Sequence, residues 1–135
     1  MFVLHPRLAA DTVPLLVWPL CHVLLMNDSA YPWLILVPAR PDIGELHQLS
    51  AGDRAVLIEE IARAAEGLAE TTGAHKINTA ALGNVVPQLH VHVIARFRHD
   101  PAWPRPVWGV HPAVPYAESG LADLRSRLRR RLGGE

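Results

Sequence analysis

Two closely spaced histidines, His90 and His92, are the residues of this chain whose type and spacing best suit chemistry. They lie in Gln88-Leu89-His90-Val91-His92-Val93-Ile94, where polar residues alternate with aliphatic ones. This period of two is typical of a strand with one buried face, so Gln88, His90 and His92 are expected on one side, with the two imidazoles roughly 7 Å apart. The pair could form a catalytic site, a metal site or a polar rim.

Asparagine and glycine residues precede this strand and bear on which of these three kinds of site the histidine pair forms. Asn78 lies about one hairpin earlier, and Gly83-Asn84 lies in the connecting turn. Neutral amide donors and a backbone opened by glycine suit a phosphate or a ribose that must approach closely. Turn capping by Asn78 and Asn84 is the equally good structural explanation.

The elements that must position these residues are predicted as follows. Leu15–Trp18 and His22–Met26 are expected as two short strands or one bent strand. A turn at 27–32 then leads to a strand at Trp33–Val37 that Pro38 ends, which together predict a β-hairpin.

The strongest helical pattern covers Ser50 to Thr72. Ser50 can cap its N-terminus with Asp53 as partner, and Gly73 can end it. Other expected elements are an ambiguous lead-in or short helix at 1–12, a loop at 41–49 with up to one helical turn, strands at 76–82 and 88–97, a Pro- and Trp-rich loop at 99–115, and a final helix carrying Leu121, Leu124, Leu128 and Leu132.

Composition limits the class of protein. A chain of 135 residues predicts one domain, and a net charge of zero argues against a general nucleic-acid binder. Cys21 is the only cysteine, which indicates a reducing compartment. The apolar run at 13–26 is broken by Pro14 and Pro19 and is too short to span a membrane. Without a secretory signal pattern, the expected location is cytoplasmic.

Taken together, these stretches resemble the histidine-triad (HIT) family of nucleotide hydrolases and transferases. The family motif is His-φ-His-φ-His-φ-φ, where φ is apolar, and residues 88–94 match it except at Gln88. Leu24–Asn27 with Trp33–Pro38 looks like the family's nucleoside-binding hairpin, and Asn78–Asn84 looks like its phosphate-side turn. The resemblance covers roughly residues 20–108.

The resemblance implies an α+β fold with a mostly antiparallel sheet of about five strands, one main helix and a C-terminal helix. The whole chain, 1–135, would be a single HIT-like domain, with 99–135 forming the Pro/Trp-rich loop and the C-terminal helix. The resemblance also implies a homodimer and a purine nucleotide or nucleotide derivative as partner. Neither a cofactor nor a metal ion is required, and neither a membrane nor a specific nucleic acid is expected as a partner.

Roles for the site residues follow from the same resemblance. His90 corresponds to the nucleophile that attacks phosphorus, and His92 to the histidine that contacts the phosphate. Gln88 replaces the first histidine and can orient groups but cannot take up a proton. The ribose contact is implied at Asn27, and the phosphate-side contacts are implied at Asn78, Gly83 and Asn84. Trp33 stands where many members have a histidine, and packing is its expected role.

The expected function is therefore hydrolysis or transfer at the α-phosphorus of a nucleoside phosphoramidate or a dinucleoside polyphosphate, through a covalent nucleotidyl-histidine. One alternative is a nucleotide-binding or sensing protein with little turnover, because Gln88 breaks the triad. Another is a metal-dependent cupin barrel. That motif needs a glutamate where this chain has Ala95 and Arg96, and a barrel would not contain the helix at 50–72.

Overall fold

Five antiparallel strands form one sheet in the order β1-β2-β3-β5-β4 in the computed structural model, which describes residues 1–133. The strands are β1 (Thr12–Val17), β2 (Cys21–Met26), β3 (Trp33–Pro38), β4 (Lys76–Ala80) and β5 (Val91–Arg96). The helices are α1 (Pro6–Asp11), the short 3-10 turn η1 (Leu46–Gln48), α2 (Ala51–Thr72) and α3 (Glu118–Gly133). The expected α+β fold with a five-stranded antiparallel sheet is confirmed.

The ends of α2 are where the capping residues predict them. The Ser50 hydroxyl accepts from the Asp53 N–H at 3.1 Å, and Gly73 closes the helix in the left-handed region with φ 71°. A side chain at Gly73 would strain this backbone, which explains why the helix ends there. No helix among residues 1–133 is both long and apolar enough to cross a bilayer.

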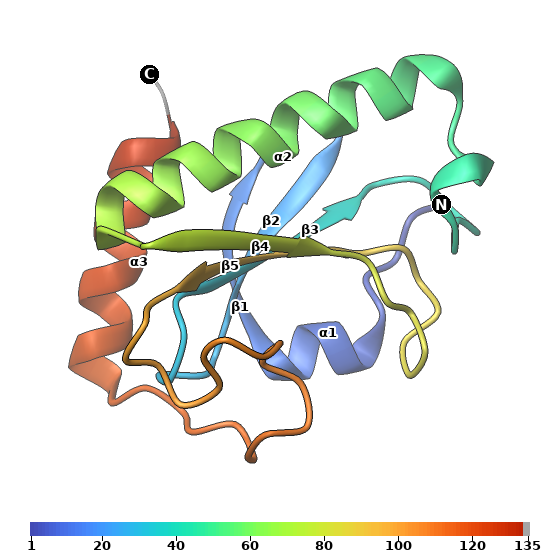
Figure 1. Cartoon of the computed structure of the whole chain (residues 1–135). Helices are drawn as coiled ribbons and strands as arrows, with labels where there is room; N and C mark the ends of the chain where they lie inside the picture. The colour runs from blue at the N-terminus through green and yellow to red at the C-terminus, as the bar shows by residue number, and fades with distance from the viewer. Residues whose placement is uncertain (134–135) are drawn as a thin grey trace.

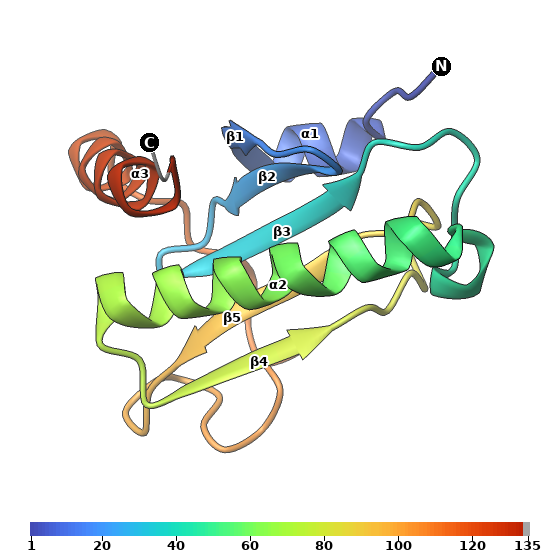
Figure 2. The same cartoon turned by 90° about the horizontal axis from the view of Figure 1, so that it is seen from above.

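The two faces of the sheet carry different covers (Figures 1 and 2). Helix α2 lies across one face and contacts β5, while α3 packs beside it against β1. Alternate residues of β2, β3 and β5 fill this side, including Val23, Leu34 and Val93. The opposite face is covered by α1 and by the loops around β5, and it holds a second apolar cluster with Leu24, Ile35 and Ile94. The second face is the one that carries the paired histidines.

The structure decides between the two predicted alternatives for the segments at 15–18 and 22–26 and moves several strand ends. The two segments belong to separate strands that pair with each other, and the first of these strands begins earlier than predicted, at Thr12. Strand β4 ends at Ala80 rather than at Leu82. Strand β5 begins at Val91 rather than at Gln88, because the backbone N–H of Leu89 donates to Ile43 at 2.9 Å instead of joining the sheet.

The buried ion pair Arg96–Asp100 anchors the Pro-rich loop that follows β5. The Arg96 guanidinium donates to both carboxylate oxygens of Asp100, at 2.8 and 3.0 Å, and also to the Arg105 carbonyl. Asp100 accepts further from the backbone N–H groups of Phe97, Ala102 and Trp103. Every polar atom of this pair that is removed from water thus has a partner, as a buried charge requires.

Candidate functional site

His90 lies immediately before β5 with one ring nitrogen occupied. Its Nδ1 lies 2.7 Å from the carbonyl oxygen of Gln88. A carbonyl can only accept, so Nδ1 carries the proton, and Nε2 keeps its lone pair. The side chain is 6% exposed.

His92 stands next to His90 with the opposite arrangement of ring protons. Its Nδ1 accepts from the indole N–H of Trp33 at 3.0 Å, so its Nε2 carries the proton. Burial, followed by the neighbouring His90, lowers the pKa of His92 to about 4. His92 is therefore neutral at pH 7 and presents an N–H donor. The two ring centroids are 4.9 Å apart, closer than the roughly 7 Å expected for two residues of one regular strand.

Both imidazoles line a cavity of about 320 Å³ on the second face of the sheet. Its walls come from α1, from β2 and β3, from the turn at 82–86 and from the Pro-rich loop. The lining is largely apolar and includes Leu8, Met26, Ile35, Val86 and Trp108, with Arg7 and Asp11 as its charged residues. A concave, mostly apolar site with a few polar groups is typical of a small-molecule site.

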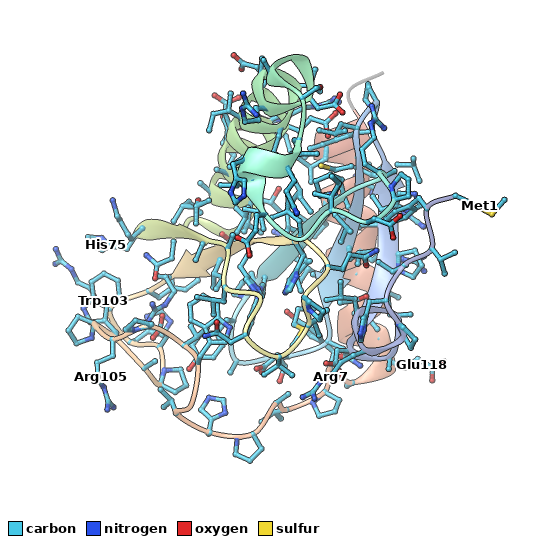
Figure 3. The ribbon with its side chains drawn as sticks, turned by 90° about the vertical axis from the view of Figure 1, so that its right-hand side faces the viewer. Met1, Arg7, His75, Trp103, Arg105 and Glu118 are labelled. Carbon is cyan, nitrogen blue, oxygen red and sulfur yellow. The ribbon has the colours of Figure 1, made fainter. Side chains whose placement is uncertain are left out.

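Trp108 closes the cavity beside His92. The two rings meet edge to face with centroids 5.0 Å apart, and Trp108 also contacts the edge of Trp33. Trp103 lies elsewhere, against His75 at 5.3 Å, on the side of the molecule away from Arg7 (Figure 3). Of the two tryptophans in the Pro-rich loop, only Trp108 therefore reaches the site.

A second cavity, also of about 320 Å³, opens on the other side of His90. It is lined by Gly83 and Leu89 together with Glu45 and His47 around η1. Both cavities are lined by Leu82, Gly83 and His90, so a molecule bound next to His90 has room on two sides.

The side chain of Gln88 is held by the N-terminal segment. Its Oε1 accepts from the His5 backbone N–H at 2.8 Å, and its Nε2 donates to the Val3 carbonyl at 2.9 Å. Leu89 packs in the α2-side cluster with Val91 and Val93, which agrees with the expected alternation, but Gln88 does not line the cavity that holds both histidines. The backbone carbonyl of Gln88 is the part that contacts His90.

Replacing Gln88 by Ala should therefore release the N-terminal segment. Two hydrogen bonds are lost, which should cost about 1–2 kcal/mol of unfolding free energy. Amide hydrogen exchange at His5 should accelerate relative to wild type. Gln48→Ala is the matched control, since the Gln48 side chain also makes two hydrogen bonds to the backbone, in its case accepting from the N–H groups of Gly44 and Glu45. Unchanged amide exchange at His5 in Gln88→Ala would show that Gln88 does not hold the N-terminal segment.

Two of the sequence-predicted binding residues are bound to other parts of the chain. Asn27 accepts from the Tyr116 backbone N–H at 2.9 Å, and Asn78 accepts from Arg96 at 2.7 Å. Neither residue lines the cavity that holds both histidines. Asn27 thus holds the segment that precedes α3, and Asn78, which lies within β4 and caps no turn, binds the last residue of β5.

Gly83 and Asn84 do line the cavity, as the resemblance implied. Gly83 has φ 74°, a conformation that favours glycine, and it brings the turn backbone towards His90. Met26 and Ile35 also line the cavity and belong to the hairpin that was expected to bind the nucleoside. The lining residues that the sequence did not predict are Arg7, Leu8 and Asp11, because nothing in the local pattern of α1 indicated that this helix borders the histidines.

Metal ligation was one of the three possibilities for the histidine pair. Within residues 1–133, no group of three or more His, Cys, Asp or Glu side chains is arranged to hold a metal ion. In addition, one ring nitrogen of each histidine already has a protein partner.

Comparison with known proteins identifies the family. The family model described as the HIT domain matches residues 9–99. A histidine triad protein from Marinobacter aquaeolei VT8 is 50% identical, with a TM-score of 0.96 over 98% of this chain and 97% of that one. Histidine triad proteins from Bradyrhizobium japonicum and Sinorhizobium meliloti 1021 are 47% and 48% identical, with TM-scores of 0.95 and 0.94. They cover 97% and 96% of this chain, and 98% and 96% of their own chains are matched.

The search of the curated proteins found no match. The matched family model covers most of the chain, from α1 to the end of β5, and the solved structures share the whole fold. The chain therefore belongs to the histidine-triad family.

Proposed function

We propose that this protein hydrolyses or transfers the nucleotidyl group of a nucleoside phosphate derivative, either a phosphoramidate or a dinucleoside polyphosphate. The observation that carries the proposal is the 2.7 Å contact between His90 Nδ1 and the Gln88 carbonyl. It leaves Nε2 of a neutral imidazole as the nucleophile, next to a second imidazole whose Nε2–H can donate to a phosphate oxygen.

In the first step, the Nε2 lone pair of His90 attacks the α-phosphorus and forms an N–P bond. The bond from phosphorus to the leaving group breaks, and the leaving group departs with the electron pair and is protonated by solvent. The imidazole becomes cationic, and the Gln88 carbonyl stabilises that charge through Nδ1–H. His92 donates its Nε2–H to a phosphate oxygen, whose negative charge it stabilises.

In the second step, water attacks the same phosphorus. A P–O bond forms, the P–N bond to His90 breaks with its electron pair returning to Nε2, and the proton of the attacking water goes to solvent. If a different acceptor takes the place of water, the nucleotidyl group is transferred instead. The products are a nucleoside monophosphate or its ester and an unchanged, neutral His90.

The shape of the cavity supports a nucleoside as the bound group. Leu8, Met26 and Ile35 offer an apolar wall for a base, and Asp11 offers a carboxylate that can accept from ribose hydroxyls. A cavity of about 320 Å³ falls at the lower end of the usual range for small ligands, roughly 300–1,000 Å³. The second cavity beyond His90 leaves space for the leaving group.

A nucleotide-binding or sensing protein with little turnover is the second candidate. The side chain of Gln88 favours it, because its amide holds the N-terminal segment and adds no side-chain group to the chemistry. This candidate keeps the cavity and the phosphate contact of His92 but loses the rate of the covalent step.

The test is to trap the covalent intermediate. The protein is mixed with adenosine phosphoramidate or with diadenosine polyphosphates, quenched and digested, and the peptides are analysed by mass spectrometry. A nucleotidyl adduct on His90 together with release of nucleoside monophosphate supports the enzyme. Tight binding of nucleotide without adduct or turnover would favour the sensing protein and end the enzyme proposal for these substrates.

We also propose that the chain is a homodimer in the cytoplasm, as expected from the family resemblance. Strand β4 is an edge of the sheet, so one side of its backbone has no partner strand among residues 1–133. An exposed edge is commonly protected by pairing with another chain. Sedimentation equilibrium should therefore give twice the mass of one 14.9 kDa chain. A monomer at micromolar concentration would refute the dimer.

A further inference from the structure

Trp33 is the only residue that contacts a ring nitrogen of His92 among the hydrogen bonds of residues 1–133. It lies on β3, on the same face of the sheet as the histidines, and is 5% exposed. Tyr31 packs against one part of its indole and Trp108 against another, with ring centroids 6.3 and 5.9 Å away. The indole is thus held in place from two sides, and its N–H is aimed at His92.

An indole can donate a hydrogen bond but cannot accept one. Facing Trp33, His92 Nδ1 must therefore remain an acceptor, and the single ring proton of His92 must sit on Nε2. A histidine at position 33, which the family resemblance suggests for many members, could donate or accept and could pass a proton on. Trp33 removes both options for this chain.

Protonation of Nδ1 would bring two N–H groups face to face and leave the indole N–H without an acceptor. The charged and titratable groups that share the cavity with His92 are His90, Arg7 and Asp11. Arg7 and Asp11 pair with each other at 3.6 Å, so they offer little net charge to an imidazolium. Trp108 and Asn84, which line other walls of the cavity, are uncharged.

We propose that Trp33 is a positioning residue that fixes His92 as an Nε2–H donor to the phosphate and prevents His92 from acting as a general acid. This inference rests on the proposed function for the phosphate, whereas the fixed tautomer is a property of the protein alone. His92 then gives a hydrogen bond but never a proton, because Trp33 cannot replace the proton that would leave.

The first test is the tautomer of His92 in the wild-type protein, read from the two-bond 1H–15N correlations of its ring. We expect a single neutral Nε2–H form that persists down to about pH 4, where the lowered pKa of His92 lies. An Nδ1–H form, or protonation near pH 6.5, would overturn the proposal. This measurement needs no substrate, so its failure is distinct from failure of the proposed function.

The second test compares Trp33→Phe with Trp103→Phe. Both variants lose an indole N–H, but Trp103 packs against His75 and Arg96 outside the cavity. In Trp33→Phe, the Nδ1–H tautomer of His92 should appear and its titration should move to higher pH. Trp103→Phe should keep the wild-type tautomer and titration. A wild-type spectrum in Trp33→Phe would overturn the proposal.

Activity provides the third readout. On a substrate that the wild type turns over, Trp33→Phe should lower kcat about five- to tenfold, which is the effect of one net hydrogen bond, while KM changes little. The acid limb of its pH profile should move upwards together with the titration of His92. A loss confined to KM, with the acid limb unmoved, would assign Trp33 to packing alone.

Discussion

Replacing His90 by Asn is expected to lower kcat/KM at least about a thousandfold, because the nucleophile of the covalent step is lost. An amide nitrogen has no comparable lone pair to attack phosphorus, although Asn keeps a polar side chain of similar size. Nucleoside monophosphate should still bind, since the apolar wall, His92 and Asp11 are unchanged. The measurements are steady-state turnover and calorimetric binding on the same preparation.

His99→Asn is the matched control for this substitution. His99 follows β5 on the exposed side, against Phe97, and does not line the cavity. It should keep wild-type activity. If His90→Asn retains more than about a tenth of the wild-type rate, then His90 is not the nucleophile, and the covalent mechanism fails even if turnover is real.

Replacing Arg96 by Met is expected to destabilise the protein by about 3–5 kcal/mol, because it leaves the Asp100 carboxylate buried without its partner. The two side chains are 1% and 3% exposed, so water cannot take the place of the guanidinium. The lost bonds to Asn78 and to the Arg105 carbonyl add to the effect. Urea unfolding of the variant and the wild type measures the change in unfolding free energy, provided that the two proteins have the same m-value.

An exposed ion pair provides the control for Arg96. Arg127 and Asp123 on α3 are 3.8 Å apart and largely exposed, so Arg127→Met should cost no more than about 1 kcal/mol. A similar cost at both positions would mean that burial does not govern the Arg96–Asp100 pair.

The same buried pair predicts how stability depends on acid. Burial by itself would raise the pKa of Asp100, but hydrogen bonds from Arg96, Phe97 and Trp103 outweigh burial and lower that pKa to about 2 from the ordinary 3.8. The folded state thus has the lower pKa, so this stabilisation is complete above about pH 4 and is lost as pH falls towards 2. Asp100→Asn should lack this part of the acid dependence.

Local patterns were sufficient to predict much of the fold. The helix at 51–72 follows from its capping residues Ser50 and Gly73, and the end of β3 follows from Pro38. The alternation around His92 correctly indicated which residues of β5 share a face. These features depend on neighbours within a few positions, which a sequence displays directly.

The errors arose where distant segments compete for a polar group. The Gln88 side chain meets Val3 and His5, more than eighty positions away in sequence, and no local pattern encodes that contact. Buried Glu60 on α2 is a similar case, since it accepts from the backbone N–H groups of Leu20, in the turn before β2, and of Cys21, the first residue of β2. A carboxylate on the buried stripe of a predicted helix is nevertheless a signal that such a distant partner is needed.

The sequence predicted that the two histidines lie side by side, but it predicted the walls of their cavity only in part. The paired histidines, Gly83 and Asn84 lie together, whereas Asn27 and Asn78 do not join them. Trp33 was expected only to pack, yet its N–H sets the proton position of His92. The direction of one N–H bond depends on the register of β3 against β5, which a single sequence does not reveal.

The Pro-rich loop that carries Trp108 is anchored at both ends. Arg96 and Asp100 hold its beginning, and Asp28 with Ser29 holds Val114 near its end. The conformational entropy of this wall is therefore lost when the chain folds, not when a ligand arrives. A ligand that contacts Trp108 meets a preorganised surface, and more of its contact energy is available as affinity.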